Sequence, residues 1–309
     1  MDQAYDIIIA GGGLAGLTAA VTAGRLGRKT LVLTGDVIGG QLLSIEKIEG
    51  FPGFPEGVPG YDLGPMTQEE AATAGAEFAA TELKSLAADG NRWRLATGEG
   101  DVMARAVVLA TGSSLRELAV PGEARLRGQG VSHCASCDAP LLRDKIAVVV
   151  GGGDSAMQEA LTLAQHVKEV AILTHGAGLA GQTSFRERVT QNPKIKVRPQ
   201  VEVQEILGDA KVTGVRMRDM SGGVVTDLAA DAVFVYTGLQ PNTAFLESRI
   251  KLGAGGGIPT DEWMHTELAG VCAAGTVRTG SACRAASSAG YGAAAAIAVD
   301  RYLTDGAWR

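Results

Sequence analysis

The residues best suited to chemistry are two cysteines separated by two positions. Cys134 and Cys137 are followed directly by Asp138. A C-x-x-C pair can close a redox disulfide, and a neighbouring acid can exchange a proton with a thiolate. A zinc half-site and a purely structural disulfide are the alternatives. Zinc would need a second cysteine pair, and Cys272 and Cys283 are too far apart to form one, so the pattern favours redox chemistry.

Other titratable candidates give weaker signals. His133 precedes Cys134 and could lower the pKa of its thiol, although an ordinary loop histidine is the competing interpretation. Cys272 and Cys283 are expected to be small buried residues. The remaining histidines lack metal-ligand spacing, so no metal site is expected.

Two glycine turns could each bind a dinucleotide. The run 11–16, GGGLAG, satisfies G-x-G-x-x-G between an apolar run (5–10) and a helical pattern (14–27). Glycine there lets the backbone approach a pyrophosphate at a helix N-terminus. Gly151, Gly153 and Ala156 form a second such fingerprint. At both turns, tight helix packing alone is the alternative.

The elements around these turns indicate two βαβ units. Residues 5–35 and 145–175 each contain a buried strand, a glycine turn, an Ala-rich helix and a second strand. Further patterns predict a helix over 67–80, strands around residue 90, a buried strand over 106–112, a small meander over 197–236, a strand over 271–274 and a helix over 285–303. The tail has no unit of its own and is expected to rejoin the first.

Composition restricts the class of protein. With 309 residues, the chain is long enough for roughly two domains. A net charge of −6 gives no support for nucleic-acid binding. Four cysteines are too few for a disulfide scaffold, which indicates a reducing compartment. The N-terminus lacks the basic residues of a secretory signal, and the glycines within 7–24 make a poor membrane helix, so a cytoplasmic protein without a membrane partner is expected.

An ordered series of motifs resembles the low-molecular-weight, bacterial-type thioredoxin reductase family along nearly the whole chain. The series is GGGLAGLTAA (11–20), GGQL (39–42), ATG (110–112), GVSHCASCD (130–138), GGGDSAMQEA (151–160), GLQPNTAFL (238–246) and SAGYGAAAA (288–296). The C-x-x-C-D directly before the second glycine fingerprint is the most specific of these motifs.

The resemblance implies an α/β fold of two Rossmann-like (three-layer ββα/βα) dinucleotide-binding domains, the second inserted in the first. It implies an FAD domain over 1–114 and 243–309, a nicotinamide-type domain over 115–242, hinges near 113–117 and 241–244, and a homodimer. Electrons would pass through flavin and the cysteine pair to thioredoxin or a thioredoxin-like protein. Cys137 would face the flavin, Cys134 would attack the partner disulfide, and Asp138 would be the acid and base.

The resemblance also assigns cofactor contacts. For FAD these are Gly11, Gly13, Ala15, Gly16, Thr34, Gly40, Gln41, Leu42, Thr111, Gly112, Gly275, Thr276, Arg284 and Ala285. For a nicotinamide dinucleotide they are Gly151, Gly153, Ser155 and Ala156.

Two departures from the family pattern bear on the cofactors. NADPH-using members carry an H-R-R-x-x-x-R run that clamps the 2′-phosphate, whereas here Thr174-His175-Gly176-Ala177-Gly178 follows the strand. Use of NADPH or NADH is therefore in question, although Arg186 or Arg188 could reach back. On the flavin side, Thr276 stands where the family has an acid, and Gly50 replaces an Asn. Three hypotheses stay open: a nicotinamide-dependent reductase, a relative using another donor such as ferredoxin or running as a dithiol oxidase, and a non-catalytic flavin- or partner-binding protein.

Overall fold

The computed structural model describes residues 4–308, which form two compact units. The first contains the chain up to Ser114 and again from Gln240, and the second is Leu115–Leu239. The chain leaves the first unit through β7 (Ser113–Leu115) and returns through β16 (Leu239–Pro241), and these two strands pair with each other. The expected α/β fold, with one Rossmann-like unit inserted in another, is confirmed.

The first unit is built on a sheet whose central strands are parallel. The apolar run at the N-terminus becomes β1, whose core residues Ile7, Ile8 and Ile9 are fully buried, as expected of a strand covered on both faces. The order is β3-β2-β1-β6-β5-β4, with β17 also paired to β6. The strand bounds are β1 Ala4–Ala10, β2 Thr30–Leu33, β3 Glu77–Ala79, β4 Leu83–Asp89, β5 Arg92–Thr97, β6 Gly100–Leu109 and β17 Val271–Ala273.

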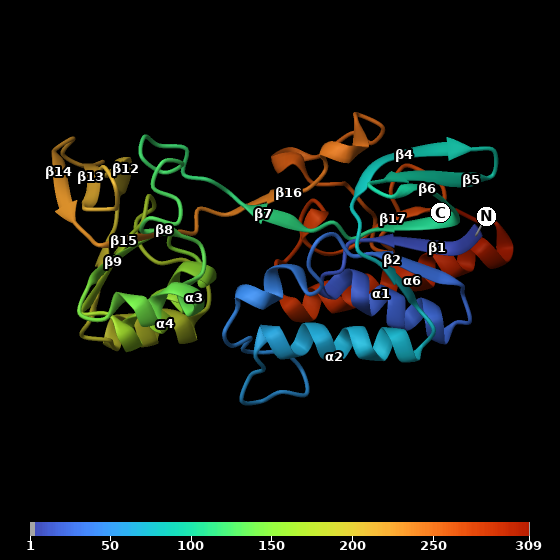
Figure 1. Ribbon diagram of the computed structural model, residues 1–309, viewed down its shortest axis with the longest axis horizontal. Helices are drawn as coiled ribbons and strands as arrows, with labels where there is room; N and C mark the ends of the chain where they lie inside the picture. Colours follow the sequence, from blue (N-terminus) through green and yellow to red (C-terminus); the bar gives the residue numbers. More distant parts are fainter. Residues whose placement is uncertain (1–3, 309) are drawn as a thin grey trace. The chain divides into compact units, whose positions relative to one another are not determined.

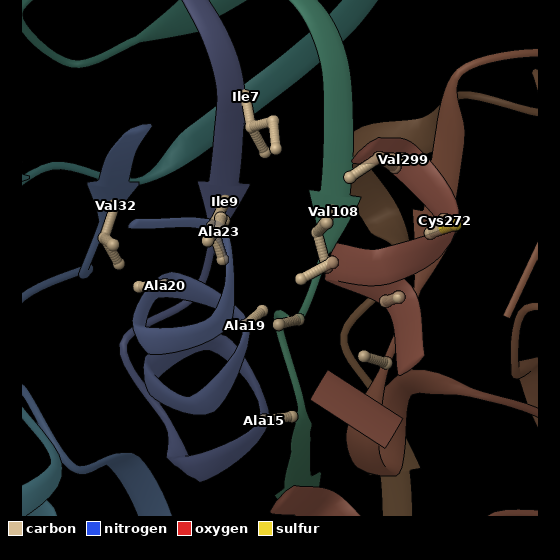
Figure 2. Packing of buried hydrophobic residues seen from close by; sticks show 14 of the residues in the cluster. Ile7, Ile9, Ala15, Ala19, Ala20, Ala23, Val32, Val108, Cys272 and Val299 are labelled. Atoms are coloured by element: carbon tan, nitrogen blue, oxygen red, sulfur yellow. The ribbon is translucent and has the colours of Figure 1, made fainter. Parts of the chain in front are cut away.

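Three helices lie on one side of this sheet, and the β4–β5 hairpin continues the sheet from β6, with which β5 pairs antiparallel (Figure 1). A Cβ at Gly292 would collide with the carbonyl oxygen of Ala15, so the helices that carry these residues pack with their backbones close together. Ala15, Ala19, Val108 and Val299 belong to one core of mostly small side chains, and in Figure 2 Ala19 points toward the strand that carries Val108. The helical elements of the unit are α1 Leu14–Arg25, η1 Gly40–Ser44, α2 Gly60–Thr73, η3 Ala244–Leu246, η4 Ala254–Gly256, η5 Gly275–Val277 and α6 Ala285–Asp305.

The second unit repeats the arrangement with five parallel strands. Their order is β11-β10-β9-β15-β8, and the central strands β9 and β10 are buried except at their first residues. A separate antiparallel sheet, β12-β13-β14, follows β11. The strands are β8 Val131–Ser132, β9 Ile146–Val150, β10 Glu169–Leu173, β11 Ile195–Arg198, β12 Val201–Leu207, β13 Gly214–Asp219, β14 Val225–Ala229 and β15 Ala232–Val235. The helical elements are α3 Ala135–Asp138, η2 Ala139–Leu142, α4 Asp154–His166 and α5 Thr183–Gln191.

Two predicted elements were wrong in their bounds or partners. The helix expected over 67–80 is α2, which begins at Gly60 and accommodates Pro65, and the end of that range is strand β3. Residues 77–79 form a strand because they pair with β2 at the edge of the sheet, where Phe78 lies opposite Val32. The last strand of the predicted meander, β15, instead joins the parallel sheet, as its four buried residues require.

None of the helices within 4–308 combines the length and the hydropathy that a membrane crossing needs.

Candidate active site

The cysteine pair lies at the start of a short helix that follows β8. Cys134 is the N-cap of α3 in an extended conformation, and it forms a disulfide with Cys137. The amide of Cys137 donates to Cys134 Sγ at 3.2 Å, and the amide of Asp138 donates to the Cys134 carbonyl at 3.3 Å. Within the described residues no three His, Cys, Asp or Glu side chains are grouped to hold a metal ion. The two sulfurs are thus bonded to each other.

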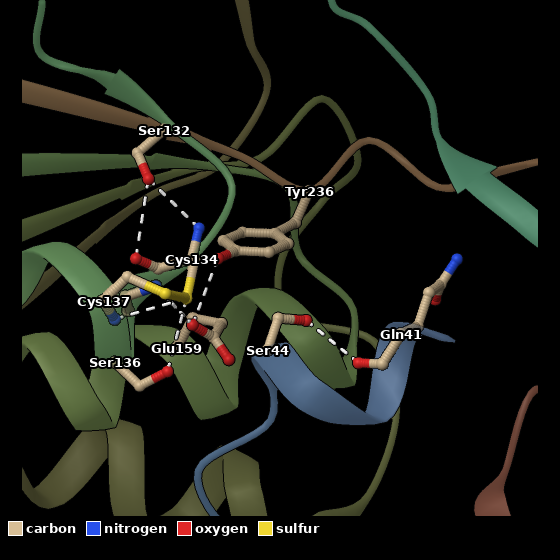
Figure 3. The surroundings of a disulfide bond; sticks show 9 residues. Gln41, Ser44, Ser132, Cys134, Ser136, Cys137, Glu159 and Tyr236 are labelled. Atoms are coloured by element: carbon tan, nitrogen blue, oxygen red, sulfur yellow. Dashed lines mark hydrogen bonds between the residues drawn. A yellow bond between two sulfur atoms is a disulfide. The ribbon is translucent and has the colours of Figure 1, made fainter. Parts of the chain in front are cut away.

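Polar side chains fix the backbone around the first cysteine. Ser132 Oγ accepts from the Cys134 amide at 3.1 Å, and Ser136 Oγ lies 3.4 Å from Cys134 Sγ (Figure 3). His133 Nδ1 lies 3.0 Å from the Val235 carbonyl oxygen. Because a carbonyl only accepts, Nδ1 carries the proton of this histidine.

A buried carboxylate lies behind the cysteine helix. Glu159 of α4 is 8% exposed, and its Oε2 accepts from the Ala135 amide at 2.9 Å and from the Tyr236 hydroxyl at 3.1 Å (Figure 3). Burial, and next the charge of Glu159, raise the pKa of Tyr236, so its phenol stays a proton donor. The first turn of α3 is therefore attached to the core of the second unit through a charged group.

The two other cysteines differ from each other. Cys272 lies in β17, where burial raises the pKa of its thiol well above the ordinary range. Cys283 is exposed and has a positive φ of 53°, so the expectation that it is buried was wrong. Its side chain is turned outward because it precedes the N-terminus of α6 instead of lying within a strand.

The first glycine turn has the geometry of a dinucleotide loop. Gly11 has φ of +120°, and a Cβ there would lie 2.6 Å from the Ala110 carbonyl carbon. A Cβ at Gly16 would collide with the Gly11 carbonyl oxygen. Gly13, the N-cap of α1, has no other atom within 4 Å of its Cβ position. Two glycines thus allow close packing, and the third leaves open space before a helix N-terminus.

The remaining residues assigned to FAD come together around this turn. Gly40, Gln41 and Leu42 lie on η1, where a Cβ at Gly40 would be 3.6 Å from Gly13 Cα, and the Gln41 amide donates to the Ser113 carbonyl. A Cβ at Gly275 would lie 2.9 Å from Ala15 Cβ. The other residues lie where strands end or helices begin: Thr34 after β2, Thr111 and Gly112 after β6, Thr276 on η5, and Arg284 and Ala285 at the start of α6.

Hydrogen bonds join two of these chain ends. Thr111 Oγ1 donates to the Asn242 carbonyl at 2.8 Å, and Asn242 Nδ2 donates to the Thr111 carbonyl at 3.0 Å. Ser113 Oγ donates to the Thr276 carbonyl at 2.8 Å, and Thr276 Oγ1 lies 3.7 Å from the Cβ position of Gly112. The carboxyl ends of β6 and β17 are therefore held beside each other.

The second glycine turn repeats the backbone contacts of the first. A Cβ at Gly151 would lie 2.9 Å from the Tyr236 carbonyl carbon, and Gly153 is open like Gly13. The amide of Ala180 donates to the Gly152 carbonyl at 2.8 Å, just as Gly39 donates to Gly12 at 2.9 Å. Ser155 and Ala156 lie in the first turn of α4, and Ala156 is fully buried.

The region expected to recognise the adenosine end of a nicotinamide cofactor contains no arginine between residues 174 and 182. Arg186 donates to Thr183 Oγ1 at 2.9 Å, and Arg188 lies over the Phe185 ring, so both contacts stay within α5. The carboxylate of Asp154 instead accepts from the Gln182 amide at 2.7 Å.

Glu159, Tyr236 and Asn242 were not among the residues singled out from the sequence. A signal existed for Glu159, since it shares a helix face with Ala156 and Leu163, both fully buried. A charged residue on an apolar face needs a partner. Nothing in the sequence identifies that partner as Tyr236, which follows β15 and lies 77 positions away.

Comparison with known proteins agrees with this geometry. The family model for pyridine nucleotide-disulphide oxidoreductases matches residues 5–295. The thioredoxin reductase of Treponema pallidum is 36% identical over 98% of both chains, and that of Mycolicibacterium smegmatis is 37% identical over 97% of both. The crystal structure of Lactococcus lactis thioredoxin reductase, 32% identical, superposes with a TM-score of 0.94 and covers 97% of this chain and 99% of that one. The chain therefore belongs to the pyridine nucleotide-disulphide oxidoreductases, in the low-molecular-weight thioredoxin reductase family, and is a flavoprotein disulfide oxidoreductase.

Proposed function

We propose that this protein binds FAD in its first unit and reduces the disulfide of thioredoxin or a thioredoxin-like protein through Cys134 and Cys137. The observation that carries the proposal is the disulfide at the start of α3, with Asp138 in the same helix. The relatives that the chain matches over nearly their full length are named thioredoxin reductases, which supports the choice of partner.

The first glycine turn fits FAD. The open position at Gly13 faces the N-terminus of a twelve-residue helix, where a pyrophosphate is favourably bound, and the packed positions Gly11 and Gly16 bring the backbone close. Gln41, Thr111 and Thr276 would supply neutral hydrogen-bonding groups. A bound FAD would supply the two-electron relay between an electron donor and the cysteine pair.

The cysteines and Asp138 would perform the exchange with the protein substrate. In the reduced pair, the Cys134 thiolate attacks one sulfur of the partner disulfide, and the other partner sulfur leaves and takes up a proton. The Cys137 thiol then loses its proton to Asp138 and displaces the partner from Cys134, which reforms the Cys134–Cys137 bond. The partner sulfur that leaves Cys134 takes up the proton from Asp138. The partner thus gains two electrons from the pair and two protons, one from Cys137 by way of Asp138 and one that Cys134 released when its thiol ionised.

A second candidate function differs in the route by which electrons enter or leave the flavin. Without arginines over 174–182, the second unit lacks the bidentate donors that recognise a 2′-phosphate. We therefore propose that NADPH is not preferred over NADH, and we keep a nicotinamide-independent enzyme, fed by ferredoxin or acting as a dithiol oxidase, as the alternative.

Anaerobic mixing of the yellow holoenzyme with NADPH, NADH or a dithiol tests both proposals. We expect a dithiol to bleach the flavin through the cysteine pair, and NADPH to act no faster than NADH. Rapid bleaching by NADPH alone would refute the donor proposal. A protein that takes up no FAD, or variants Cys134→Ser and Cys137→Ser that still reduce thioredoxin, would refute the reductase itself.

We also propose a homodimer in the cytoplasm. The family resemblance supports the homodimer. The small number of cysteines is consistent with a reducing compartment such as the cytoplasm. Light scattering and cell fractionation are the corresponding measurements.

A further inference from the structure

The mechanism proposed above gives no role to the buried charged group behind the cysteine helix. Glu159 reaches the cysteine helix through Oε2, which accepts two hydrogen bonds, from the Ala135 amide and from the Tyr236 hydroxyl. Two donors on one oxygen favour the ionised carboxylate. Tyr236 is 9% exposed, and its raised pKa keeps the hydroxyl protonated, so it donates at any ordinary pH.

The carboxylate lies close to the sulfur of Cys134. Ala135 is the next residue along the chain, and its amide nitrogen is 2.9 Å from Oε2. Covalent geometry then limits the distance from Oε2 to Cys134 Sγ to about 8 Å. Because Glu159 is 8% exposed, water screens this charge poorly. The other titratable groups beside the cysteines are Asp138 in α3 and His133, whose Nδ1 donates to the Val235 carbonyl.

We propose that Glu159 is a positioning residue of the redox pair, whose buried charge holds the first turn of α3 and opposes negative charge on the Cys134 sulfur once the disulfide is reduced. The inference rests on the proposed redox role of Cys134 and Cys137. It explains why an ionisable side chain is retained on the apolar face of α4, where an uncharged group would be less costly to bury.

The charge of Glu159 should affect the redox equilibrium only when the reduced pair contains a thiolate. When a dithiol reduces the pair, the S–S bond breaks and takes up two electrons, while the dithiol closes to its own disulfide. Well below the ordinary thiol pKa of about 8.5, both sulfurs also take up protons, and the product is neutral. At higher pH one sulfur stays a thiolate and feels the carboxylate. Removal of the charge should therefore favour the reduced pair at alkaline pH and leave the equilibrium unchanged at acidic pH.

The test compares wild type and Glu159→Gln holoenzymes in dithiothreitol redox buffers at about pH 6.5 and about pH 9.5. Alkylation and mass spectrometry of the peptide that contains Cys134 and Cys137 measure the reduced fraction without interference from the exposed Cys283. We expect equal equilibrium constants at the lower pH. At the higher pH we expect a shift of roughly five- to tenfold toward the reduced pair in the variant, where tenfold corresponds to about 30 mV.

Two further variants separate charge from packing. Glu123 is another buried carboxylate of the second unit, 2% exposed, and it accepts from the amides of Leu118 and Ala119, neither of which belongs to α3. Glu123→Gln should leave the cysteine equilibrium unchanged at both pH values. Tyr236→Phe removes a hydrogen bond but keeps the carboxylate, so it should stay within about twofold of wild type.

Three outcomes would overturn the inference. One is an unchanged equilibrium in Glu159→Gln at alkaline pH, and another is an equal shift at both pH values, which would indicate a packing effect. The third needs no variant and is the pKa of the Cys134 thiol in reduced wild type, measured from the pH dependence of alkylation. A value below about 7 would mean that the charge of Glu159 does not destabilise the thiolate. If the flavin never reduces the pair, the proposed function fails, whereas this equilibrium with dithiothreitol can still be measured.

Discussion

Gly11 and Gly13 belong to one turn, yet alanine at each position should have a different effect. At Gly11 the added Cβ would lie 2.6 Å from the Ala110 carbonyl carbon and 3.0 Å from the Thr111 amide nitrogen, at φ of +120°. Backbone strain of about 1–3 kcal/mol and a comparable overpacking cost add to roughly 2–6 kcal/mol. Such a loss is a large part of the stability of a typical domain, about 5–15 kcal/mol.

Gly13→Ala should leave the fold intact and impair the cofactor. Its φ is −79°, and no other atom lies within 4 Å of the Cβ position, so the apoprotein should lose at most about 1 kcal/mol. The same Cβ would occupy the space through which a pyrophosphate approaches the backbone. We expect FAD affinity to fall at least about tenfold, equivalent to about 1.4 kcal/mol.

Urea denaturation of the flavin-free proteins and fluorescence titration with FAD measure the two effects separately. Gly11→Ala should lower the midpoint of unfolding, and Gly13→Ala should lower only the affinity for FAD. Unchanged FAD affinity in a stable Gly13→Ala protein would refute the assignment of this turn to the cofactor. Wild-type stability in Gly11→Ala would refute the packing argument.

Three further predictions concern residues of the first unit. Asn242→Ala removes the amide that donates to the Thr111 carbonyl, and we expect unfolding to require about 1–3 kcal/mol less, as measured in urea. Thr276→Asp should bind FAD roughly fivefold tighter in fluorescence titrations, because a carboxylate makes stronger hydrogen bonds to hydroxyl groups than a neutral oxygen does; weaker binding would contradict this. Burial and the hydrogen bond to Glu77 raise the pKa of Tyr5 to about 12, whereas an unfolded tyrosine ionises near 10. Stability should therefore fall as the pH rises from about 10 to 12, and Tyr5→Phe should flatten that fall in denaturation curves.

The elements that frame both glycine turns were predictable because their signals are local. An apolar run that ends at glycines and precedes small helical residues fixes β1 and α1, and the same pattern fixes β9 and α4. By contrast, β3 is a strand because its Phe78 meets β2, and Pro65 obscures the start of α2. These features depend on contacts between residues that are far apart in the sequence, so a short stretch of sequence does not reveal them.

The candidate site divides in the same way. The cysteines, Asp138 and the glycines are recognisable from spacing alone. The hydrogen bonds that connect Glu159 to α3, and Asn242 to Thr111, join positions separated by 24 and 131 residues. They exist only once the sheets have formed, so spacing along the chain could not identify them.

The central claim is that bound flavin and the Cys134–Cys137 disulfide share electrons. Anaerobic titration of the holoenzyme with dithionite tests it directly, with Cys134→Ser as the matched variant. The wild type should accept twice as many electrons per flavin as Cys134→Ser before the flavin is fully bleached, because its disulfide is reduced as well. Equal electron uptake by the two proteins, with the disulfide still closed in the bleached wild type, would contradict the account.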